Sequence, residues 1–270
     1  FYNVEIIVDS ETDLKNRIGI NLDIIQGERA TIDTLKITGA AQFSDKSLLN
    51  LFSIGEPNIF PINFFTKKNR YTEIELSQGI ESLSNYYLNA GYLDFQVKNI
   101  DSKLNEDKTK IYINIAISEG IQYKLGDVTY SGDLGNKTSN DLNNLLSLNS
   151  GDIFNRQSVI NDIEKIKDLF ADQGYAFAEI NPTTQDFIDS VNLNIDISLK
   201  KKVYINRISI SGNTRTQDEV IRREIGISEG GLYSRSILRN SVIKLRRLGY
   251  FSNVQMDASE VEGYPDKINL

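Results

Sequence analysis

The residue types that usually carry catalysis are scarce in this chain. Its 270 residues include no His and no Cys, which excludes His-based triads, thiolate nucleophiles, the common zinc sites and disulfides. Catalysis would have to rest on carboxylates, Lys, Ser or Tyr. Glu73 and Glu75 resemble a pair of glycosidase acids, but residues two apart do not share a helix face. We therefore predict no catalytic residue, no metal ligand and no cofactor.

A second candidate for chemistry is the segment GDLGNKTS at residues 132–139, which looks like a phosphate-binding loop. In that motif Gly and Lys are adjacent and come directly before the Thr or Ser. Here Asn136 separates Gly135 from Lys137, so the motif is not met. The segment is instead typical of a turn that leads into a helix.

Composition narrows the function classes further. Apolar residues make up 40% of the chain and charged residues 25%, as in a globular protein. No stretch approaches the roughly 18 consecutive apolar residues of a membrane-spanning helix, and no basic-then-apolar leader opens the chain. The first residues already alternate like a strand, so we expect a piece of a longer protein. The net charge of −7 argues against a nucleic-acid partner, because phosphates favour Lys and Arg.

A Gly followed by a Tyr recurs three times in matching contexts. Each pair follows a run with apolar residues at helical spacing, such as Leu76, Ile80 and Leu83. The Gly is expected just past the helix end, where a left-handed backbone costs Gly almost nothing. The Tyr should be the first large residue of the strand that follows. The pairs are Gly91 with Tyr92, Gly174 with Tyr175, and Gly249 with Tyr250.

Strands with one buried and one wet face follow these pairs. The pattern is clearest at residues 190–199, where Val191, Leu193 and Ile195 alternate with polar residues. Each unit opens with another strand that ends in a glycine turn, and a short helix that begins with Ser or Thr comes next. The order is therefore strand, helix, helix, strand, strand. The opening glycines are Gly39, Gly132 and Gly212.

These repeats divide the chain into one partial unit and three further units. Residues 1–29 are predicted to be the last two strands of a preceding unit. The next units span residues 30–120, with a long loop at 55–71, then 121–201, and then 202–270 with its closing strand cut short. Their period exceeds the roughly 20 to 50 residues of solenoid repeats, so each unit should close its own core. The connections lack flexible-linker composition, so adjacent units should be in contact.

These features together resemble POTRA domains, the polypeptide-transport-associated modules. The segment SEGIQYKLGDVTYSG at one junction carries the likeness, and so does EVIRREIGISEGGLYSRSILRNSVIKLRRLGYFSNV, which is similar to the last POTRA domain of an outer-membrane β-barrel assembly factor. The resemblance covers essentially the whole chain and implies an α+β fold. Each domain should have a three-stranded mixed sheet packed against two helices. One departure is SLKKKVY, which lacks the acidic residue and Gly of the earlier junction, Glu119 and Gly120.

The resemblance also implies a location and partners. Such domains lie in the periplasm and precede a membrane barrel, which would be a C-terminal partner absent from this chain. They bind unfolded outer-membrane proteins and dock accessory lipoproteins. Two alternatives remain open: a structural spacer of a related POTRA-bearing secretion pore that binds no client, and an enzyme with carboxylates in a cleft between units.

In the family, the strand after each Gly-Tyr pair lies at the sheet edge, where β-augmentation could bind a client backbone of almost any sequence. Because the apolar residues alternate with polar ones, their side chains can equally be core, and both interpretations are compatible. The first complete unit is the preferred site, with the edge residues Leu93, Phe95, Gln96, Val97 and Lys98.

The resemblance also implies a second surface, on the last unit. An acid that matches Glu224 takes part in lipoprotein docking in the family, which makes Arg222, Arg223 and Glu224 the predicted docking cluster. Lys244, Arg246 and Arg247 lie near it in the sequence. Charge runs of this kind are also typical of solvated helix faces.

Overall fold

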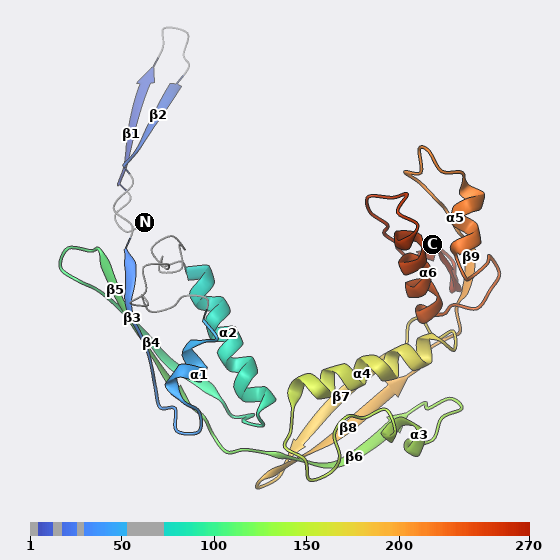
Figure 1. The fold of residues 1–270 in the computed structure, drawn as a ribbon, viewed down its shortest axis with the longest axis horizontal. Coiled ribbons are helices and arrows are strands. Elements are labelled where there is room, and N and C mark those ends of the chain that lie inside the picture. Colours follow the sequence, from blue (N-terminus) through green and yellow to red (C-terminus); the bar gives the residue numbers. More distant parts are fainter. Residues whose placement is uncertain (1–4, 13–17, 26–29, 53–72) are drawn as a thin grey trace. The chain divides into compact units, whose positions relative to one another are not determined.

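The computed structural model describes residues 5–12, 18–25, 30–52 and 73–270. Their strands form four separate sheets, shown in sequence colours in Figure 1. The chain divides into two compact parts, Phe1–Gln122 and Tyr123–Leu270, and each is considered by itself. The predicted long loop at 55–71 lies outside the described residues.

The first sheet is a hairpin of β1 (Glu5–Thr12) and β2 (Ile18–Ile25), paired antiparallel. This matches the two strands predicted for the partial unit. Its described apolar side chains are all exposed, at 42–63% of their surface, and they are Ile6, Ile7, Val8, Ile20, Leu22 and Ile24.

The first complete unit has the predicted order of elements. It contains β3 (Thr31–Thr38), α1 (Asp45–Leu49), α2 (Glu73–Asn89), β4 (Gln96–Leu104) and β5 (Lys110–Ser118). In the sheet, β5 lies between β3 and β4, and it is parallel to β3 and antiparallel to β4. The last strand in sequence is therefore the central one.

The core of this unit forms because β5 alternates buried Ile with more exposed residues. Ile113 and Ile115 pack with Leu48 of α1 and with Leu83 and Tyr87 of α2 in one cluster. Both helices therefore cover the same face of the sheet, and β5 is buried beneath them (Figure 1).

The second complete unit repeats this plan. It contains β6 (Lys124–Gly132), α3 (Ser139–Asn143), α4 (Arg156–Ala171), β7 (Glu179–Asp186) and β8 (Ser190–Ser198). The central strand is again the last one, in the order β6-β8-β7. Ile195 and Val191 of β8 are fully buried, together with Ile166 and Phe170 of α4.

The third unit has shorter strands. It contains β9 (Tyr204–Arg207), α5 (Asp218–Glu224), α6 (Arg235–Arg247), β10 (Ser259–Val261) and β11 (Tyr264–Asn269), in the order β10-β11-β9. The opening strand was predicted to reach Gly212, but β9 ends at Arg207. Arg207 pairs with Asn269, the last residue of β11. Beyond it Leu270 donates its backbone N–H to Arg207 O and accepts from the Ser209 N–H, both at 2.8 Å, but residues 208–212 form no strand.

The predicted fold class is confirmed, because three mixed three-stranded sheets each pack with helices in the expected order. The sequence predicts Ser44, Ser139 and Thr216 as the N-caps of the three short helices. Ser44 caps α1 as predicted. Thr138 rather than Ser139 caps α3, and the N-cap of α5 is Gln217, whose side chain makes no capping bond.

The predicted glycines take left-handed backbone conformations. All six have positive φ, between 70° and 97°, namely Gly39, Gly91, Gly132, Gly174, Gly212 and Gly249. At Gly39 and Gly132 a side chain would also collide with the central strand. A Cβ there would lie 2.2 Å from Ile117 O and 2.1 Å from Ile197 O.

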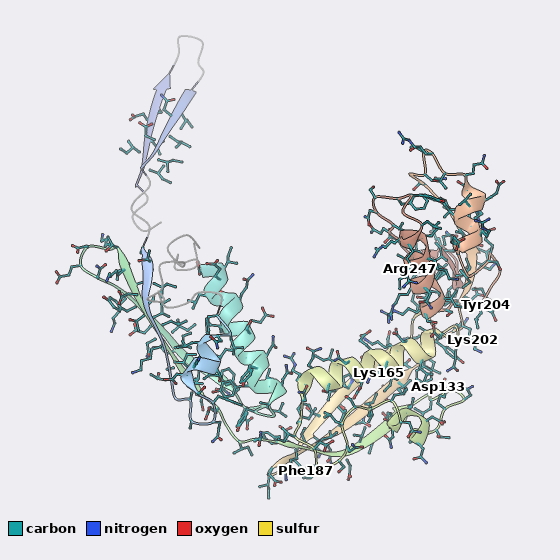
Figure 2. All side chains as sticks on the ribbon, in the orientation of Figure 1. Asp133, Lys165, Phe187, Lys202, Tyr204 and Arg247 are labelled. Atoms are coloured by element: carbon teal, nitrogen blue, oxygen red, sulfur yellow. The ribbon has the colours of Figure 1, made fainter. Side chains whose placement is uncertain are left out.

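The second and third units meet directly. Val203 donates its backbone N–H to Gly174 O at 2.8 Å, and the Leu232 side chain packs onto Gly174. The Lys202 ammonium lies 5.4 Å from the centre of the Tyr175 ring, within cation–π range. Figure 2 shows Lys202 and Tyr204 at this junction, close to the end of α4.

Two negative findings hold for residues 5–12, 18–25, 30–52 and 73–270. No helix there is both long and apolar enough to cross a membrane. No cluster of three or more acidic side chains there is arranged to hold a metal ion.

Candidate functional site

Each three-stranded sheet has two edge strands, and in the second and third units the chain itself covers one of them. In the second unit, Leu125 of β6 donates its backbone N–H to Asp152 O at 2.8 Å, and Gly151 donates to Leu125 O at 2.7 Å. A β-bridge also joins Lys124 to Ile153. The segment before α4 therefore occupies the outer side of β6.

The third unit repeats this arrangement. Ile205 of β9 donates to Gly231 O at 2.9 Å and accepts from Gly230 at 2.7 Å. Tyr204 also forms a β-bridge with Leu232. The segment before α6 thus covers the outer side of β9. In the first unit, the segment before α2 lies outside the described residues.

In the first and second units, the edges opposite β3 and β6 are formed by β4 and β7. Both are open in the part of the chain that the structure describes. Each strand pairs with the central strand of its sheet. Within residues 30–52 and 73–270, no backbone hydrogen bond connects its outer side to another segment. Such an edge presents N–H and C=O groups that an extended chain can pair with.

The ladder between β4 and β5 shows which backbone groups point outward. Asn105 donates its backbone N–H to Lys110 O at 3.0 Å, and antiparallel pairs alternate between bonded and non-bonded ones. The backbone groups of Ile100, Ser102 and Leu104 therefore face away from β5. Before this run the register shifts between Val97 and Asn99, so that Lys98 forms a β-bulge.

The two faces of β4 differ in chemistry. Ile100 and Leu104 pair with the buried residues Ile115 and Ile111 of β5, so they lie on the face that the helices cover. Ile100 is nevertheless 42% exposed, because the sheet ends at β4. The other face is polar and carries Asn99, Asp101 and Lys103.

The five residues predicted for the client edge do not all lie in the strand. Leu93 and Phe95 precede β4, in a turn where Phe95 donates its backbone N–H to Tyr92 O at 3.2 Å. Gln96 and Val97 open β4, and Lys98 forms the bulge. The regular part of the open edge lies further on, and its residues Ser102 and Leu104 were not predicted. The sequence signal for this part of the strand is the pair of apolar residues Ile100 and Leu104, which come before the polar turn that leads into β5.

Phe95 holds the entry to β4 against the core. Its ring stacks on Tyr87 with centroids 4.3 Å apart and an interplanar angle of 13°. The Tyr87 hydroxyl donates to Glu119 Oε1 at 2.8 Å, and the Gln42 backbone N–H donates to the same oxygen at 3.1 Å. Burial, followed by the hydrogen bond to Glu119, raises the pKa of Tyr87 above its ordinary value.

The predicted docking cluster divides into a structural part and an exposed part. Arg222 donates to Ile208 O at 2.7 Å, and its guanidinium lies 3.6 Å from Glu229. The Ile208 backbone N–H donates to Glu229 at 2.9 Å. This bond, with help from Arg222, lowers the pKa of Glu229. Arg222 therefore holds the segment after β9 in place.

The other part of the cluster consists of the exposed Arg223 and the half-buried Glu224. Their side chains are 75% and 26% exposed and lie 3.6 Å apart. On α6, Arg246 donates to Val254 O at 2.8 Å. Lys244 and Arg247 are exposed, and Figure 2 shows Arg247 near the C-terminal end of that helix.

Comparison with known proteins identifies the repeat. The family model described as "POTRA: Surface antigen variable number repeat" matches residues 30–120, 123–199 and 203–270. The chain belongs to the POTRA family. The three matches correspond to the three complete units, each with its own sheet.

The chain is also similar to proteins in which POTRA domains are part of a longer sequence. It is 34% identical over 258 residues to the outer membrane protein assembly factor BamA of Neisseria meningitidis serogroup B, which covers 95% of this chain and 32% of that protein. The BamA of Buchnera aphidicola is 29% identical over 89% of this chain and 39% of its own length. The chain thus spans about a third of the length of these relatives.

A solved structure with the same fold is BamA POTRA3-5 of Haemophilus influenzae. It superposes with a TM-score of 0.74 and 24% identity, over 90% of this chain and 94% of that one. This likeness supports the arrangement of elements within consecutive POTRA domains.

Proposed function

We propose that this POTRA array is a periplasmic polypeptide-binding scaffold in the assembly of outer-membrane β-barrel proteins. The similarity to outer membrane protein assembly factors supports a part in this assembly process. The observation that carries the binding mode is the contrast between the two edges of the sheets. β6 and β9 are covered by the chain, whereas the outer side of β4 is open along Ile100, Ser102 and Leu104 among the described residues.

The chemistry of β4 favours one class of visitor. A strand that adds to this edge gains main-chain hydrogen bonds whatever its sequence. On one face it would cover the half-exposed Ile100, and on the other it would meet Asp101 and Lys103. An extended segment that alternates apolar and polar residues suits both faces, and the strands of membrane barrels have that pattern.

Peptide titration followed by amide NMR tests the binding mode. A peptide of about ten residues that alternates Val or Tyr with Ser or Thr is added to the full chain. We expect shifts along residues 96–104 that saturate, and an isomer with the same composition but clustered apolar residues should bind more weakly. Ser102→Pro should abolish the shifts, because it removes an outward donor. The matched control is Asn99→Thr, which keeps the backbone N–H that faces β5. Asn99→Pro would remove that N–H and so disturb the sheet itself.

If the array is a spacer that binds no client, the opposite result is expected. The amide NMR signals of β4 would then not shift at saturating peptide, although the protein is folded. An enzyme would lose activity on replacement of one or two carboxylates without unfolding.

Docking of accessory lipoproteins is the second part of the proposal, and it is confined to Arg223 and Glu224. Arg222 makes two contacts within the last unit, and its replacement would destabilise that unit. Reversal of a charge at the rim of an interface changes association, and 26% of the Glu224 side chain is exposed. Glu224→Lys should therefore weaken capture of a purified accessory lipoprotein, whereas Glu260→Lys, on β10, should not. Equal capture by both variants would remove this surface from the proposal.

A further inference from the structure

The edge strands β4 and β7 differ in that only β7 contains a proline, Pro182. It lies in the middle of β7 and pairs with Ile195 of the central strand β8. Phe187 donates its backbone N–H to Ser190 O at 2.8 Å, which fixes the alternation along this antiparallel pair. The odd-numbered residues of β7 therefore bond to β8, and the even-numbered ones face outward. Pro182 is one of the outward residues.

Proline at this position leaves the sheet intact but changes its free side. Its missing N–H would not have bonded to β8, so the ladder loses nothing, and this is one of the few settings in which strands tolerate Pro. On the outer side, however, it removes one donor between Ile180 and Thr184, and its ring occupies the space that a visiting carbonyl would need. The run of outward donors in β7 is thus interrupted at its centre.

β4 carries no such interruption. Its outward residues Ile100, Ser102 and Leu104 all have a backbone N–H, and the strand contains no Pro. An arriving strand can make a pair of bonds at each of three consecutive outward positions there. On β7 the longest uninterrupted run is two positions, Thr184 and Asp186.

The surroundings of β7 give a physical reason for closing its edge. The hairpin tip that follows exposes Phe187 at 51% and Ile188 at 92%, and Figure 2 shows Phe187 at the far end of the β7–β8 hairpin. A free edge that ends in exposed apolar residues promotes edge-to-edge aggregation. The corresponding tip of the β4–β5 hairpin carries Glu106, Asp107 and Lys108 instead.

We propose that Pro182 closes the β7 edge to extended polypeptides and so favours strand addition at β4 over β7. This inference rests on the proposed function, since it assumes that β4 accepts a strand. Pro182 is accordingly a residue that determines which of the first two complete POTRA domains takes the client.

Because the chain has no Cys, single reporters can be placed on each edge. Ile100→Cys reports on β4 and Thr184→Cys reports on β7. The probe is the alternating Val/Tyr–Ser/Thr peptide with one central Cys, and the yield of peptide–protein disulfide is measured at equal concentrations. Each reporter is tested alone and with Pro182→Thr, with Pro182→Val as a second opening variant. Circular dichroism and thermal unfolding check that each variant folds.

We expect a high disulfide yield at Ile100→Cys and background yield at Thr184→Cys while Pro182 is present. Pro182→Thr or Pro182→Val should raise the yield at Thr184→Cys several-fold and leave Ile100→Cys unchanged. The reciprocal change, Ser102→Pro, should close β4 and lower the yield at Ile100→Cys to background.

The two ideas fail in different ways. Background yield at Ile100→Cys in the otherwise unchanged chain would overturn the proposed function. A high yield at Ile100→Cys would leave the proposed function standing. The role of Pro182 would then be overturned by a high yield at Thr184→Cys while Pro182 is present, or by no rise there when a folded variant lacks the Pro.

Discussion

The carboxylate of Asp172, just past the end of α4, accepts the backbone N–H of Ser236 in the first turn of α6 at 2.8 Å. The same oxygen accepts the Ser234 hydroxyl at 2.9 Å. The first N–H groups of a helix have no partner within it, so the second POTRA domain supplies a cap for a helix of the third. This contact fixes the two helices to each other end to end.

Removal of the Asp172 carboxylate should therefore weaken the junction. Asp172→Ala is expected to cost about 1 kcal/mol of unfolding free energy, as loss of a helix cap does, and Asp172→Asn less because it keeps one acceptor. Hydrogen exchange at the Ser236 amide should accelerate in the Ala variant. Asp189→Ala, on an exposed hairpin tip, is the matched control. Unchanged exchange at Ser236 would mean that the bond contributes nothing in solution.

Ion pairs along the same two helices should make the junction sensitive to salt. Arg235 lies 3.0 Å from Asp168 and 3.5 Å from Glu164, and Arg239 lies 3.2 Å from Asp168. Single exposed pairs contribute little, but shared partners form a network. We expect spin labels at Arg156→Cys and Asn240→Cys to give a narrow distance distribution at low salt. It should broaden at about 1 M salt, where screening acts within a few ångströms.

The control for this network is a matched loss of charge. The double variant Arg235→Gln/Arg239→Gln should broaden the distribution even at low salt. Lys244→Gln/Arg247→Gln removes the same charge from the other end of α6 and should leave it narrow. If both double variants behaved alike, net charge rather than the network would be responsible.

Glycine at the end of α4 should matter for more than its backbone conformation. Gly174 and Gly249 end equivalent helices, with φ of 97° and 70°. A Cβ at Gly174 would come within 2.5 Å of Leu232 Cδ1, whereas a Cβ at Gly249 meets nothing within 4 Å. Gly249→Ala should cost about 1–2 kcal/mol from backbone strain alone. Gly174→Ala should cost about 1–3 kcal/mol more, because Leu232 must move. Urea denaturation of the two variants measures the difference, and equal costs would show that the Leu232 contact yields freely.

Much of this fold follows from local sequence patterns. The alternation of Val191, Leu193 and Ile195 predicts a strand with one buried face, and the structure places them in the core. The spacing of Ile166 and Phe170 likewise predicts the buried side of α4. These signals suffice because each pattern is set by the residues' own neighbours in the chain.

The details of the candidate site depend on pairing between distant segments, which one sequence does not specify. The apolar alternation of Leu93, Phe95 and Val97 continues through a turn into β4, so it predicts a strand that starts too early. The bulge at Lys98 exists only relative to β5. Arg222 looks like part of a solvated charge run, but its hydrogen bond to Ile208 O connects residues 14 positions apart. Pro182 could be noticed in the sequence, but its outward direction required the register with β8.

Tyr87 should give the first complete POTRA domain a distinctive response to high pH. Its phenol is fully buried and donates to Glu119, and burial is the first cause that raises its pKa above the ordinary value of 10.0. A group whose folded pKa is raised contributes stability that is complete below the unfolded pKa. That contribution is lost as the pH rises toward the folded pKa, because the unfolded chain releases the proton first. The stability of this domain should therefore fall above about pH 10.

Tyr87→Phe separates this contribution from the rest of the core. At about pH 8 the variant should lose about 1–3 kcal/mol, since Glu119 keeps the Gln42 N–H but loses the hydroxyl donor. Between about pH 8 and about pH 11 its unfolding free energy should fall less steeply than that of the parent chain, because one linked proton is gone. The measurement is urea denaturation at both pH values, and identical slopes for the variant and the parent chain would contradict the assignment. A Phe at position 87 keeps the ring on which Phe95 stacks. Peptide binding at β4 should therefore survive the substitution at about pH 8.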